Sequence, residues 1–386
     1  MRVLHAPAVG RVSAHAGARD DVARCRLLYL VGQLGPGGLE RQLCYLLAAM
    51  DRALLQPAVA VWSFSESHLY VRTLRTLGIP IFSLPKGLSG TAKLVAFRRL
   101  VGRLRPELVH SYNFWTNFPA FCATVGTPAL AIGSVRSDFA WAKREAGRVL
   151  GPLCALWPRA QILNSHAAAE AVRGCRGPLR PARIAVVPNG IDLARFPFPA
   201  ELPPRPRIVA VGSLVPVKRW DRLIATVARL RARGIDVELQ IAGRGPEQQR
   251  LERQAAALGG NGWFRMLGHL SDIPILLSES TVLAHTADHE GCPNAVMEAM
   301  AAGRAVVATD AGDVPHLVDD GRSGFVVPRG DDAALEERLG TLIADRELCR
   351  RMGEAGRARA ERLFGLDRLV DDTLAAYRAS GWKESA

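Results

Sequence analysis

Short apolar runs alternate with longer amphipathic stretches along the chain from residue 26 onward. The runs have the length of strands, and the segments between them are long enough for crossover helices, which predicts parallel sheets. Because the runs are almost continuously apolar, helices should cover both faces of each sheet. The predicted strands are 26–32, 58–64, 79–84, 107–112, 130–135, 160–165 and 184–188, then 207–214, 237–243, 263–268, 280–285, 304–309 and 324–328.

A stretch with five prolines, residues 197–207, divides this pattern into two halves and is typical of a semi-rigid linker. We therefore predict an α/β protein with two Rossmann-like, doubly wound parallel-sheet domains that face each other across a cleft. Open sheets of this kind bind ligands at the carboxyl ends of their strands. The predicted parts are a poorly ordered extension (1–25), an N-terminal domain (26–196), a linker (197–206), a C-terminal domain (207–365) and a C-terminal helix packing back on the N-terminal domain (366–386).

The composition is that of a folded protein. Of the 386 residues 48% are hydrophobic and 23% charged, which excludes wholesale disorder. No apolar run has the roughly 18 residues that span a bilayer, and the first 24 residues contain no signal-peptide core, so we expect a cytoplasmic protein. The seven cysteines show no CxxC spacing, which argues against structural zinc and against a disulfide framework.

The charge balance favours anionic partners. Lysine and arginine number 50 against 37 acidic residues, a formal net charge of +13. Nucleic acid, an anionic membrane surface and phosphate-bearing small molecules all fit this charge, and charge alone does not choose among them. The excess is largely arginine in an Ala/Arg/Leu-rich sequence, so genome composition is an equally good explanation.

Two loops that follow predicted strands are candidates for phosphate binding. Gly37 and Gly38 stand directly before a predicted helix, where a close backbone approach and free N–H groups suit an anion, although a plain strand-to-helix turn explains them as well. Lys218 and Arg219 follow the strand at 207–214 and lie near the start of the next helix. At the carboxyl edge of a sheet they could hold a diphosphate, while a solvated basic pair is the simpler interpretation.

The most specific pattern is EGCPNAVMEAMAAG, residues 290–303. Pro293 suits the first turn of a helix, so Glu290 should lie in the preceding loop and Glu298 about a turn and a half inside the helix. Carboxylates accept hydrogen bonds from vicinal sugar hydroxyls, and the helix start near Asn294 and Ala295 can receive phosphate. The alternative is a divalent cation on Asp288, His289 and Glu290, but the glycine and helix context favours direct sugar contact.

Together these segments resemble a known enzyme family. The GGLE loop, VPNGID (187–192), VGSLVPVKR (211–219), IAGRGP (241–246) and EGCPNAVMEAMAAG are similar, in order and spacing, to the retaining glycosyltransferases of family four, which have the GT-B fold. The resemblance covers residues 26–375. It implies transfer of a sugar from a nucleotide-diphosphate donor to an acceptor, without a bound metal or another cofactor, the N-terminal domain taking the acceptor and the C-terminal domain the donor.

The resemblance also implies residue roles. Glu290, beside Gly291, would contact the donor sugar, Glu298 the ribose, and Lys218 the departing diphosphate. Backbone groups of Gly37 and Gly38, and the helix start at Asn294 and Ala295, would contact phosphate.

Two positions depart from the family pattern. Ser213 stands where the family has arginine, and Arg219 or Arg244 could compensate for it. The family's HxH pair is His110-Ser111-Tyr112 here, so His110 is a weaker catalytic candidate and Tyr112 or Asn113 could take its place.

The sequence says less about the acceptor than about the donor. The segment 91–107 predicts a helix with an apolar face and basic residues elsewhere, among them Lys93, Arg98 and Arg99. It is either a crossover helix packed on its sheet or a helix whose basic face meets an anionic membrane. The family resemblance implies a glycan or lipid-linked acceptor in cell-surface polysaccharide biosynthesis, with peripheral attachment to the inner face of the cytoplasmic membrane, and no nucleic acid.

Other functions remain open. A nucleotide-sugar epimerase has the same architecture but needs no acceptor, so product analysis separates the two. A degenerate, non-catalytic nucleotide-sugar-binding protein would fit the departures at Ser213 and Tyr112. A nicotinamide-dependent oxidoreductase is not favoured, because no GxGxxG follows a strand with an acidic residue about 20 positions on.

Overall fold

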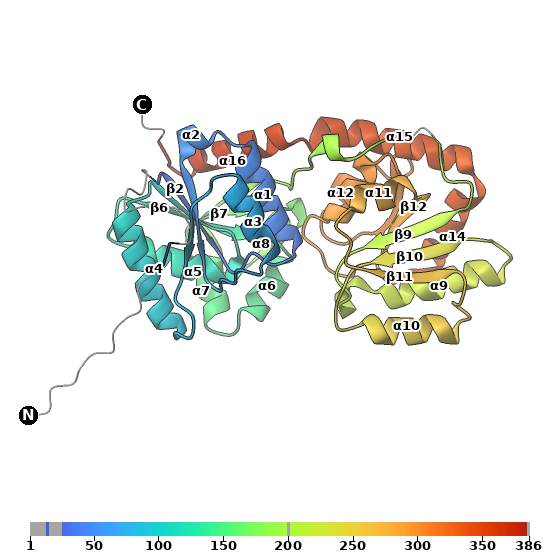
Figure 1. Ribbon diagram of the computed structural model, residues 1–386, viewed down its shortest axis with the longest axis horizontal. Coiled ribbons are helices and arrows are strands. Elements are labelled where there is room, and N and C mark those ends of the chain that lie inside the picture. The colour runs from blue at the N-terminus through green and yellow to red at the C-terminus, as the bar shows by residue number, and fades with distance from the viewer. Residues whose placement is uncertain (1–12, 15–24, 199–200, 384–386) are drawn as a thin grey trace, which may run out of the picture. The chain divides into compact units, whose positions relative to one another are not determined.

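The computed structural model describes residues 13–14, 25–198 and 201–383 (Figure 1). The chain forms two compact units. Unit 1 comprises residues 1–164, 168–187 and 369–386, and unit 2 comprises residues 165–167 and 188–368. Most of the expected N-terminal extension, and residues 199 and 200 of the expected linker, lie outside the described residues. Each unit is a parallel sheet flanked by helices, which confirms the predicted α/β class.

The sheet of unit 1 has eight strands in the order β1-β4-β3-β2-β5-β6-β7-β8. Its pairs are parallel except that Ser13 and Ala14 of β1 pair antiparallel with Ser83 and Phe82. The sequence did not predict β1. The strands are β1 Ser13–Ala14, β2 Leu27–Val31, β3 Pro57–Val61, β4 Ile81–Ser83, β5 Leu108–Ser111, β6 Leu130–Val135, β7 Ala160–Leu163 and β8 Arg183–Val186.

The helices of unit 1 include the predicted basic helix, now α4, which Ser89 caps by accepting the Ala92 N–H at 3.3 Å. Its apolar side chains Phe97, Leu100 and Val101 are buried in the core, so packing on the sheet accounts for that face. The helices are α1 Gly38–Ala49, α2 Arg52–Leu55, α3 Leu69–Thr76, α4 Gly90–Leu104, η1 Phe114–Thr116, α5 Asn117–Thr124, α6 Phe139–Glu145, α7 Leu150–Leu156 and α8 His166–Gly174.

The sheet of unit 2 has six parallel strands in the order β11-β10-β9-β12-β13-β14. Along β9, Ile208 and Ala210 belong to one hydrophobic core and Val209 to another, because successive side chains point to opposite faces. Cores on both faces explain the continuously apolar strands. The strands are β9 Arg207–Val211, β10 Glu238–Ala242, β11 Phe264–Gly268, β12 Val282–His285, β13 Ala305–Thr309 and β14 Gly324–Val327.

The helices of unit 2 cover both faces of this sheet (Figure 1). They are η2 Leu193–Arg195, η3 Pro216–Lys218, α9 Trp220–Ala232, α10 Gln248–Ala257, α11 Ile273–Ser278, α12 Asn294–Ala301, α13 Val314–Leu317, α14 Asp332–Ala344 and α15 Arg346–Leu363. The last helix, α16 Leu366–Ala379, follows. In the part of the chain that the structure describes, no helix combines the length and apolar character needed to cross a membrane.

The C-terminal residues from Leu369 onward belong to unit 1. The Tyr377 hydroxyl lies 2.8 Å from the hydroxyl of Tyr29 on β2 and 2.8 Å from Nδ1 of His110 on β5. The Trp382 indole N–H donates to Glu107 at 2.9 Å. Buried polar groups need such partners, so these bonds make the C-terminal helix a structural part of unit 1.

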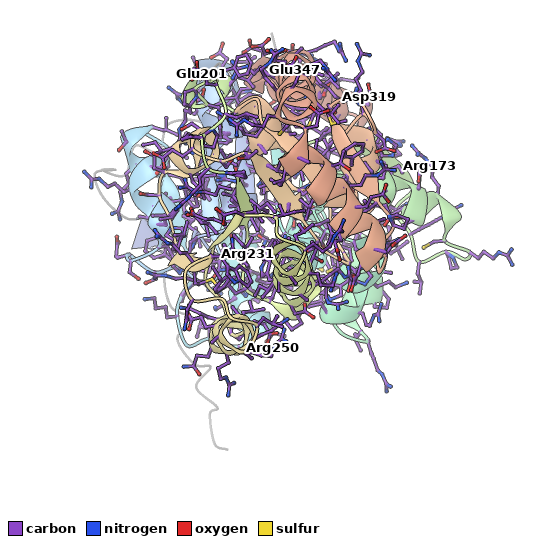
Figure 2. The ribbon with its side chains drawn as sticks, turned by 90° about the vertical axis from the view of Figure 1, so that its right-hand side faces the viewer. Arg173, Glu201, Arg231, Arg250, Asp319 and Glu347 are labelled. Atoms are coloured by element: carbon purple, nitrogen blue, oxygen red, sulfur yellow. The ribbon has the colours of Figure 1, made fainter. Side chains whose placement is uncertain are left out.

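Many charged side chains at the surface of unit 2 are paired with one another. Arg231 pairs with Asp236 at 2.8 Å and Glu347 with Arg350 at 2.7 Å, and the labelled Arg250 is paired with Glu247 (Figure 2). Exposed pairs of this kind contribute little, roughly 0–1 kcal/mol each. They show that these surface arginines of unit 2 have a carboxylate beside them.

Candidate functional site

The loop after β9 carries Lys218 two residues before a buried tryptophan, Trp220. Lys218 ends the short helix η3, Arg219 adopts a left-handed conformation with φ of 53°, and α9 begins at Trp220. The Trp220 side chain is 1% exposed, and its indole N–H donates to the carbonyl oxygen of the exposed Ser213 at 3.0 Å. The Thr286 hydroxyl donates to the Lys218 carbonyl at 2.9 Å. Packing and hydrogen bonds thus fix the backbone that carries the lysine.

Lys218 forms an ion pair with Glu290, which the sequence had singled out separately. The two side chains are 18% and 14% exposed. Burial alone would raise the pKa of Glu290, but the charge of Lys218 and the hydrogen bond from His285 outweigh burial and lower that pKa from 4.5 to about 2. Glu290 is therefore a carboxylate at neutral pH. The structure brings the two leading sequence candidates together.

His285, the last residue of β12, also faces this pair, and the sequence analysis missed it. The side chain is 1% exposed, and Nε2 lies 3.0 Å from Oε1 of Glu290. Burial lowers the pKa of His285, and Glu290 opposes this shift only in part, so the imidazole is neutral at neutral pH. A polar residue at the carboxyl end of an otherwise apolar strand was the available signal.

The second glutamate lies on α12, which begins at Asn294, one residue after Pro293, as the sequence predicted. Glu298 is 1% exposed. The Asn189 amide donates to Oδ1 of Asn294 at 2.8 Å, and the backbone carbonyl of Gly291 accepts from the Asp313 N–H at 2.8 Å. These contacts hold the loop between the two glutamates and the start of α12 in place. Ala295 is buried in the first turn of that helix.

Arg219 and Arg244, the two candidates to compensate for serine at position 213, differ in their environment. The Arg219 guanidinium donates to Asp221 at 3.2 Å and to Asp288 at 3.1 Å, so its charge is already compensated. Arg244 is exposed in the loop after β10, and no carboxylate pairs with it among the residues described. Arg244 is consequently the better candidate for a phosphate ligand.

The same contacts bear on the alternative metal site. Asp288 accepts from Arg219 and, at 3.3 Å, from Arg222, while Glu290 accepts from Lys218. The carboxylate oxygens that would ligate a cation are thus held by basic side chains. This arrangement does not fit a divalent cation on Asp288 and Glu290.

The glycine loop of unit 1 leads into α1, with Gly37 at the N-cap. The buried Glu40 of the first turn folds back, so that a Cβ at Gly37 would overlap its Oε2. Burial raises the pKa of Glu40. A carboxylate near a helix N-terminus is favourable. The place predicted for phosphate beside Gly37 and Gly38 thus holds a side-chain carboxylate in this structure.

His110 does not fit the catalytic role considered for it. Its ring is completely buried, with Nδ1 2.8 Å from the Tyr377 hydroxyl and Nε2 2.9 Å from the Ser134 hydroxyl. Burial also lowers its pKa well below the ordinary range, so the ring is neutral. Because both ring nitrogens are engaged inside unit 1, we assign His110 a structural role. The motif could not reveal this, since the partner Tyr377 is 267 residues away.

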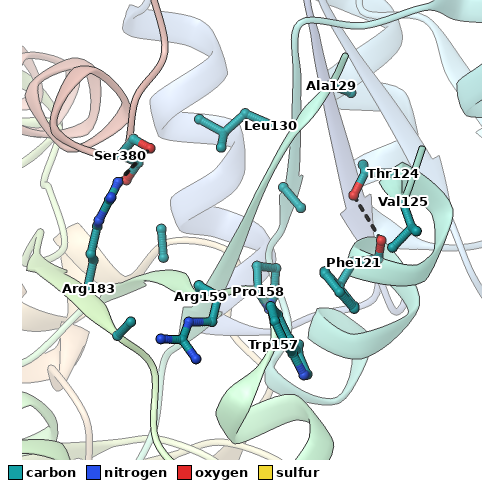
Figure 3. A pocket seen from close by; sticks show the side chains of 13 residues that line it. Phe121, Thr124, Val125, Ala129, Leu130, Trp157, Pro158, Arg159, Arg183 and Ser380 are labelled. Carbon is teal, nitrogen blue, oxygen red and sulfur yellow. Dashed lines mark hydrogen bonds between the residues drawn. The ribbon is translucent and has the colours of Figure 1, made fainter. Parts of the chain in front are cut away.

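Unit 1 also carries a hollow of about 490 Å³ at the amino ends of β6, β7 and β8 (Figure 3). Phe121 and Trp157 stack along one side with ring centroids 4.2 Å apart, and Arg183 donates to the Ser380 carbonyl at 3.4 Å. None of the site residues predicted from the sequence lines this hollow. It lies at the edge of the sheet opposite to the carboxyl ends of the strands.

Comparisons with known proteins agree with this description. A family model described as "Glycosyl transferases group 1" matches residues 195–359, and one described as "Glycosyltransferase Family 4" matches residues 36–195. The alpha-maltose-1-phosphate synthase of Mycolicibacterium smegmatis is 28% identical over 309 residues, 70% of this chain and 78% of the relative. The MMP alpha-(1->4)-mannosyltransferase of Mycolicibacterium hassiacum is 35% identical over 201 residues, which span 51% of this chain and 48% of that relative.

Solved structures show the same fold. HepE from Anabaena, in complex with UDP-glucose, matches with a TM-score of 0.78 at 20% identity, covering 92% of this chain and 99% of that one. Sucrose-phosphate synthase from Thermosynechococcus elongatus matches with a TM-score of 0.79 at 18% identity, covering 92% and 98%. The two family models, which meet at residue 195, and these folds confirm the resemblance seen in the sequence. The chain therefore belongs to the group 1 glycosyltransferases of family four, and its two units have the GT-B fold.

Proposed function

We propose that this protein is a retaining, metal-independent glycosyltransferase that moves a sugar from a nucleoside-diphosphate donor to a glycan or lipid-linked acceptor. The observation that carries the proposal is the pairing of Lys218 with Glu290 at the carboxyl edge of the unit 2 sheet, beside the neutral His285. A diphosphate needs a cation and a sugar needs hydrogen-bond acceptors, and this pair supplies one of each. The complex of HepE with UDP-glucose and the names of the mannosyltransferase relatives support the donor class.

In the proposed reaction the donor separates the ion pair. Lys218 leaves Glu290 for the diphosphate, and Glu290 takes hydrogen bonds from the sugar hydroxyls, with His285 holding its carboxylate in position. Each charged group exchanges one partner for another, so neither is left buried and unpaired. Arg244 and the backbone N–H groups at Asn294 and Ala295 are proposed as further phosphate ligands.

The bond changes balance without a protein nucleophile. The acceptor hydroxyl oxygen attacks the anomeric carbon on the face that the diphosphate leaves, and the bond from that carbon to the phosphate oxygen breaks. The hydroxyl proton passes to the departing phosphate oxygen. Negative charge grows on the diphosphate during this step, so the positive charge of Lys218 stabilises the transition state more than the bound donor.

Binding and hydrolysis measurements test this function. A thermal-shift screen of nucleoside diphosphates should find at least one that raises the melting temperature, because a ligand of the native state stabilises it. The matching nucleotide sugar should then be hydrolysed slowly without acceptor, and equally well with EDTA present. No affinity for any nucleotide sugar or nucleoside diphosphate would reject the proposal, and an isomerised sugar nucleotide would indicate an epimerase instead.

Replacing Glu298 with glutamine should raise the Michaelis constant for the donor about 10-fold and leave the turnover number nearly unchanged. The proposed ribose contact is the same in the bound donor and in the transition state, so its loss weakens binding alone. Steady-state kinetics measure both constants. Glu337→Gln, an exposed change on α14, is the matched control. A loss confined to turnover would contradict the ribose role.

We further propose that unit 1 attaches to an anionic membrane surface through the exposed basic side of α4. Arg99 and Arg103 are exposed there. Arg98 is less available to a membrane, because its guanidinium donates a hydrogen bond to the Cys122 carbonyl at 2.9 Å. A basic residue near an anionic membrane contributes about 1 kcal/mol. The protein should float with anionic vesicles at low salt, and the double substitution Arg99→Glu and Arg103→Glu should abolish flotation. The exposed Arg322→Glu is the control, and failure of the unaltered protein to float rejects the proposal.

A further inference from the structure

Unit 1 contains a cavity of about 360 Å³ beside the carboxyl ends of β5 and β6. Asn113 and Trp115 line it from the loop after β5, Arg136 from the loop after β6, and Glu145 from the end of α6. The volume falls in the range of small-molecule sites, roughly 300–1,000 Å³. Its place at the carboxyl edge of the sheet is where open α/β sheets bind ligands.

Arg136 is a cation that lines this cavity, and among the described residues no carboxylate pairs with it. Its guanidinium carbon lies 3.6 Å from the ring centroid of Tyr112, a residue with no exposed surface. Its Nε is buried without a hydrogen-bond partner, and the arginine forms no ion pair with any residue in the described ranges 25–198 and 201–383. The guanidinium therefore packs against the tyrosine ring, while its two terminal NH2 groups make no ion pair with the described residues and are the donors that a ligand in the cavity can reach.

Several other arginines of the protein show how a carboxylate can balance a guanidinium. Arg219 is held by two carboxylates, and Arg26 forms a part-buried pair with Glu107 at 2.8 Å. The surface arginines labelled in Figure 2 on α9 and α10, Arg231 and Arg250, are paired as well. A partly buried guanidinium without such a partner loses part of its hydration, and no neighbouring negative charge compensates for that loss. An anionic group on the ligand would supply the missing charge.

Two other residues that line the cavity, Trp115 and Asn113, suit a sugar ring. The Trp115 side chain covers Gly32 so closely that a Cβ there would lie 2.7 Å from its Cζ2, and it meets Trp62 edge-to-face at 5.8 Å. The Asn113 amide oxygen accepts the Gly32 N–H at 2.7 Å, which leaves its NH2 group as a donor. A fixed aromatic face beside an amide fits the C–H face and the hydroxyls of a carbohydrate.

We propose that this cavity binds the acceptor and that the acceptor sugar carries an anionic group, a phosphate or a carboxylate, held by Arg136. The inference rests on the proposed glycosyltransferase function and adds the chemical class of the acceptor. Glu145 is exposed at the edge of the cavity and would repel an anion, so the charged group lies toward Arg136 and the uncharged hydroxyls toward Glu145 and Asn113.

Binding of simple sugars to the full chain tests the inference. Calorimetry with glucose, glucose 6-phosphate and glucuronate should show the two charged sugars bound at least about 10-fold tighter than glucose, since a hydrogen bond to a charged group is worth about that factor or more. Inorganic phosphate should compete with both. Tighter binding of glucose 6-phosphate would indicate that the acceptor carries a phosphate. Tighter binding of glucuronate would indicate a carboxylate.

Three substitutions locate the effect. Arg136→Gln should weaken the charged sugars about 10- to 100-fold and leave glucose unchanged. Arg144→Gln, an exposed loss of the same charge on α6, should change none of them. Arg136→Lys keeps the charge but not the planar group, and should recover only part of the affinity.

Several results would overturn the inference. Equal affinity of the unaltered protein for charged and neutral sugars would do so without any variant, even if Arg136→Gln fails to fold. Weaker binding of a nucleoside diphosphate to Arg136→Gln would assign the arginine to the donor instead. Because donor binding and donor hydrolysis are measured without acceptor, a failure here leaves the proposed glycosyltransferase function standing and is distinguishable from its failure.

Discussion

Replacing Lys218 with alanine is expected to lower the turnover number about 100- to 1000-fold, the usual effect of removing one preorganised donor to a developing negative charge. The lysine is fixed by its backbone contacts and is 18% exposed, so its charge acts on a diphosphate with little screening by water. The substitution also leaves Glu290 without its cation, which should raise the pKa of that carboxyl from about 2 toward its ordinary value.

Steady-state and single-turnover kinetics measure the effect. Lys218→Arg should retain part of the activity because the charge is kept, and Lys86→Ala, an exposed lysine of unit 1, should behave like the unaltered protein. If turnover stays the same in Lys218→Ala while Glu290→Gln is inactive, the lysine only balances Glu290 in the resting protein. That result would remove it from the proposed reaction.

Replacing Trp220 with alanine should lower the free energy of unfolding by about 3–5 kcal/mol, the range for truncating a large buried aromatic side chain. Trp220 is 1% exposed, belongs to the larger core of unit 2 and meets the ring of His285 at 6.4 Å. Since a domain has a total stability of roughly 5–15 kcal/mol, the variant would lose much of it.

Urea denaturation followed by circular dichroism measures this change. Trp220→Phe is the matched control, because it keeps an aromatic ring and removes chiefly the indole hydrogen bond to the Ser213 carbonyl. Its loss should be smaller, about 1–2 kcal/mol. Equal losses in both variants would mean that the hydrogen bond, and not the packing of the ring, supports the Lys218 loop.

The sequence pattern was sufficient for the strands because nearly all of them are buried on both faces. All thirteen predicted runs are strands, and their ends differ by at most a few residues from the predicted ones, as β9 Arg207–Val211 against 207–214 illustrates. β1 was missed because two residues carry no periodicity, and their antiparallel pairing with β4 is non-local. The start of α12 was predictable from Pro293, whose fixed φ suits a helix start.

The site was predictable only where chemistry follows from local spacing. Glu290 and Lys218 were found from their loops, but their mutual pairing joins segments 72 residues apart. His110 and His285 both stand in apolar strands, and the sequence analysis named only His110 as a site candidate. What separates them is tertiary: His110 has two hydroxyl partners inside unit 1, whereas His285 faces Glu290 and its Nδ1 has no hydrogen-bond partner among the described residues.

The position of Tyr377 in the chain affects when unit 1 can finish folding during synthesis. The hydroxyl that satisfies Tyr29 and His110 comes from a segment that follows all of unit 2 in the chain, so the interior of unit 1 cannot be completed until unit 2 has been translated. A fragment ending at residue 187 would leave the buried Tyr29 hydroxyl and Nδ1 of His110 without the Tyr377 hydroxyl as partner. Separate production of the first unit would therefore require residues 369–383 to be supplied, as a fused or added peptide.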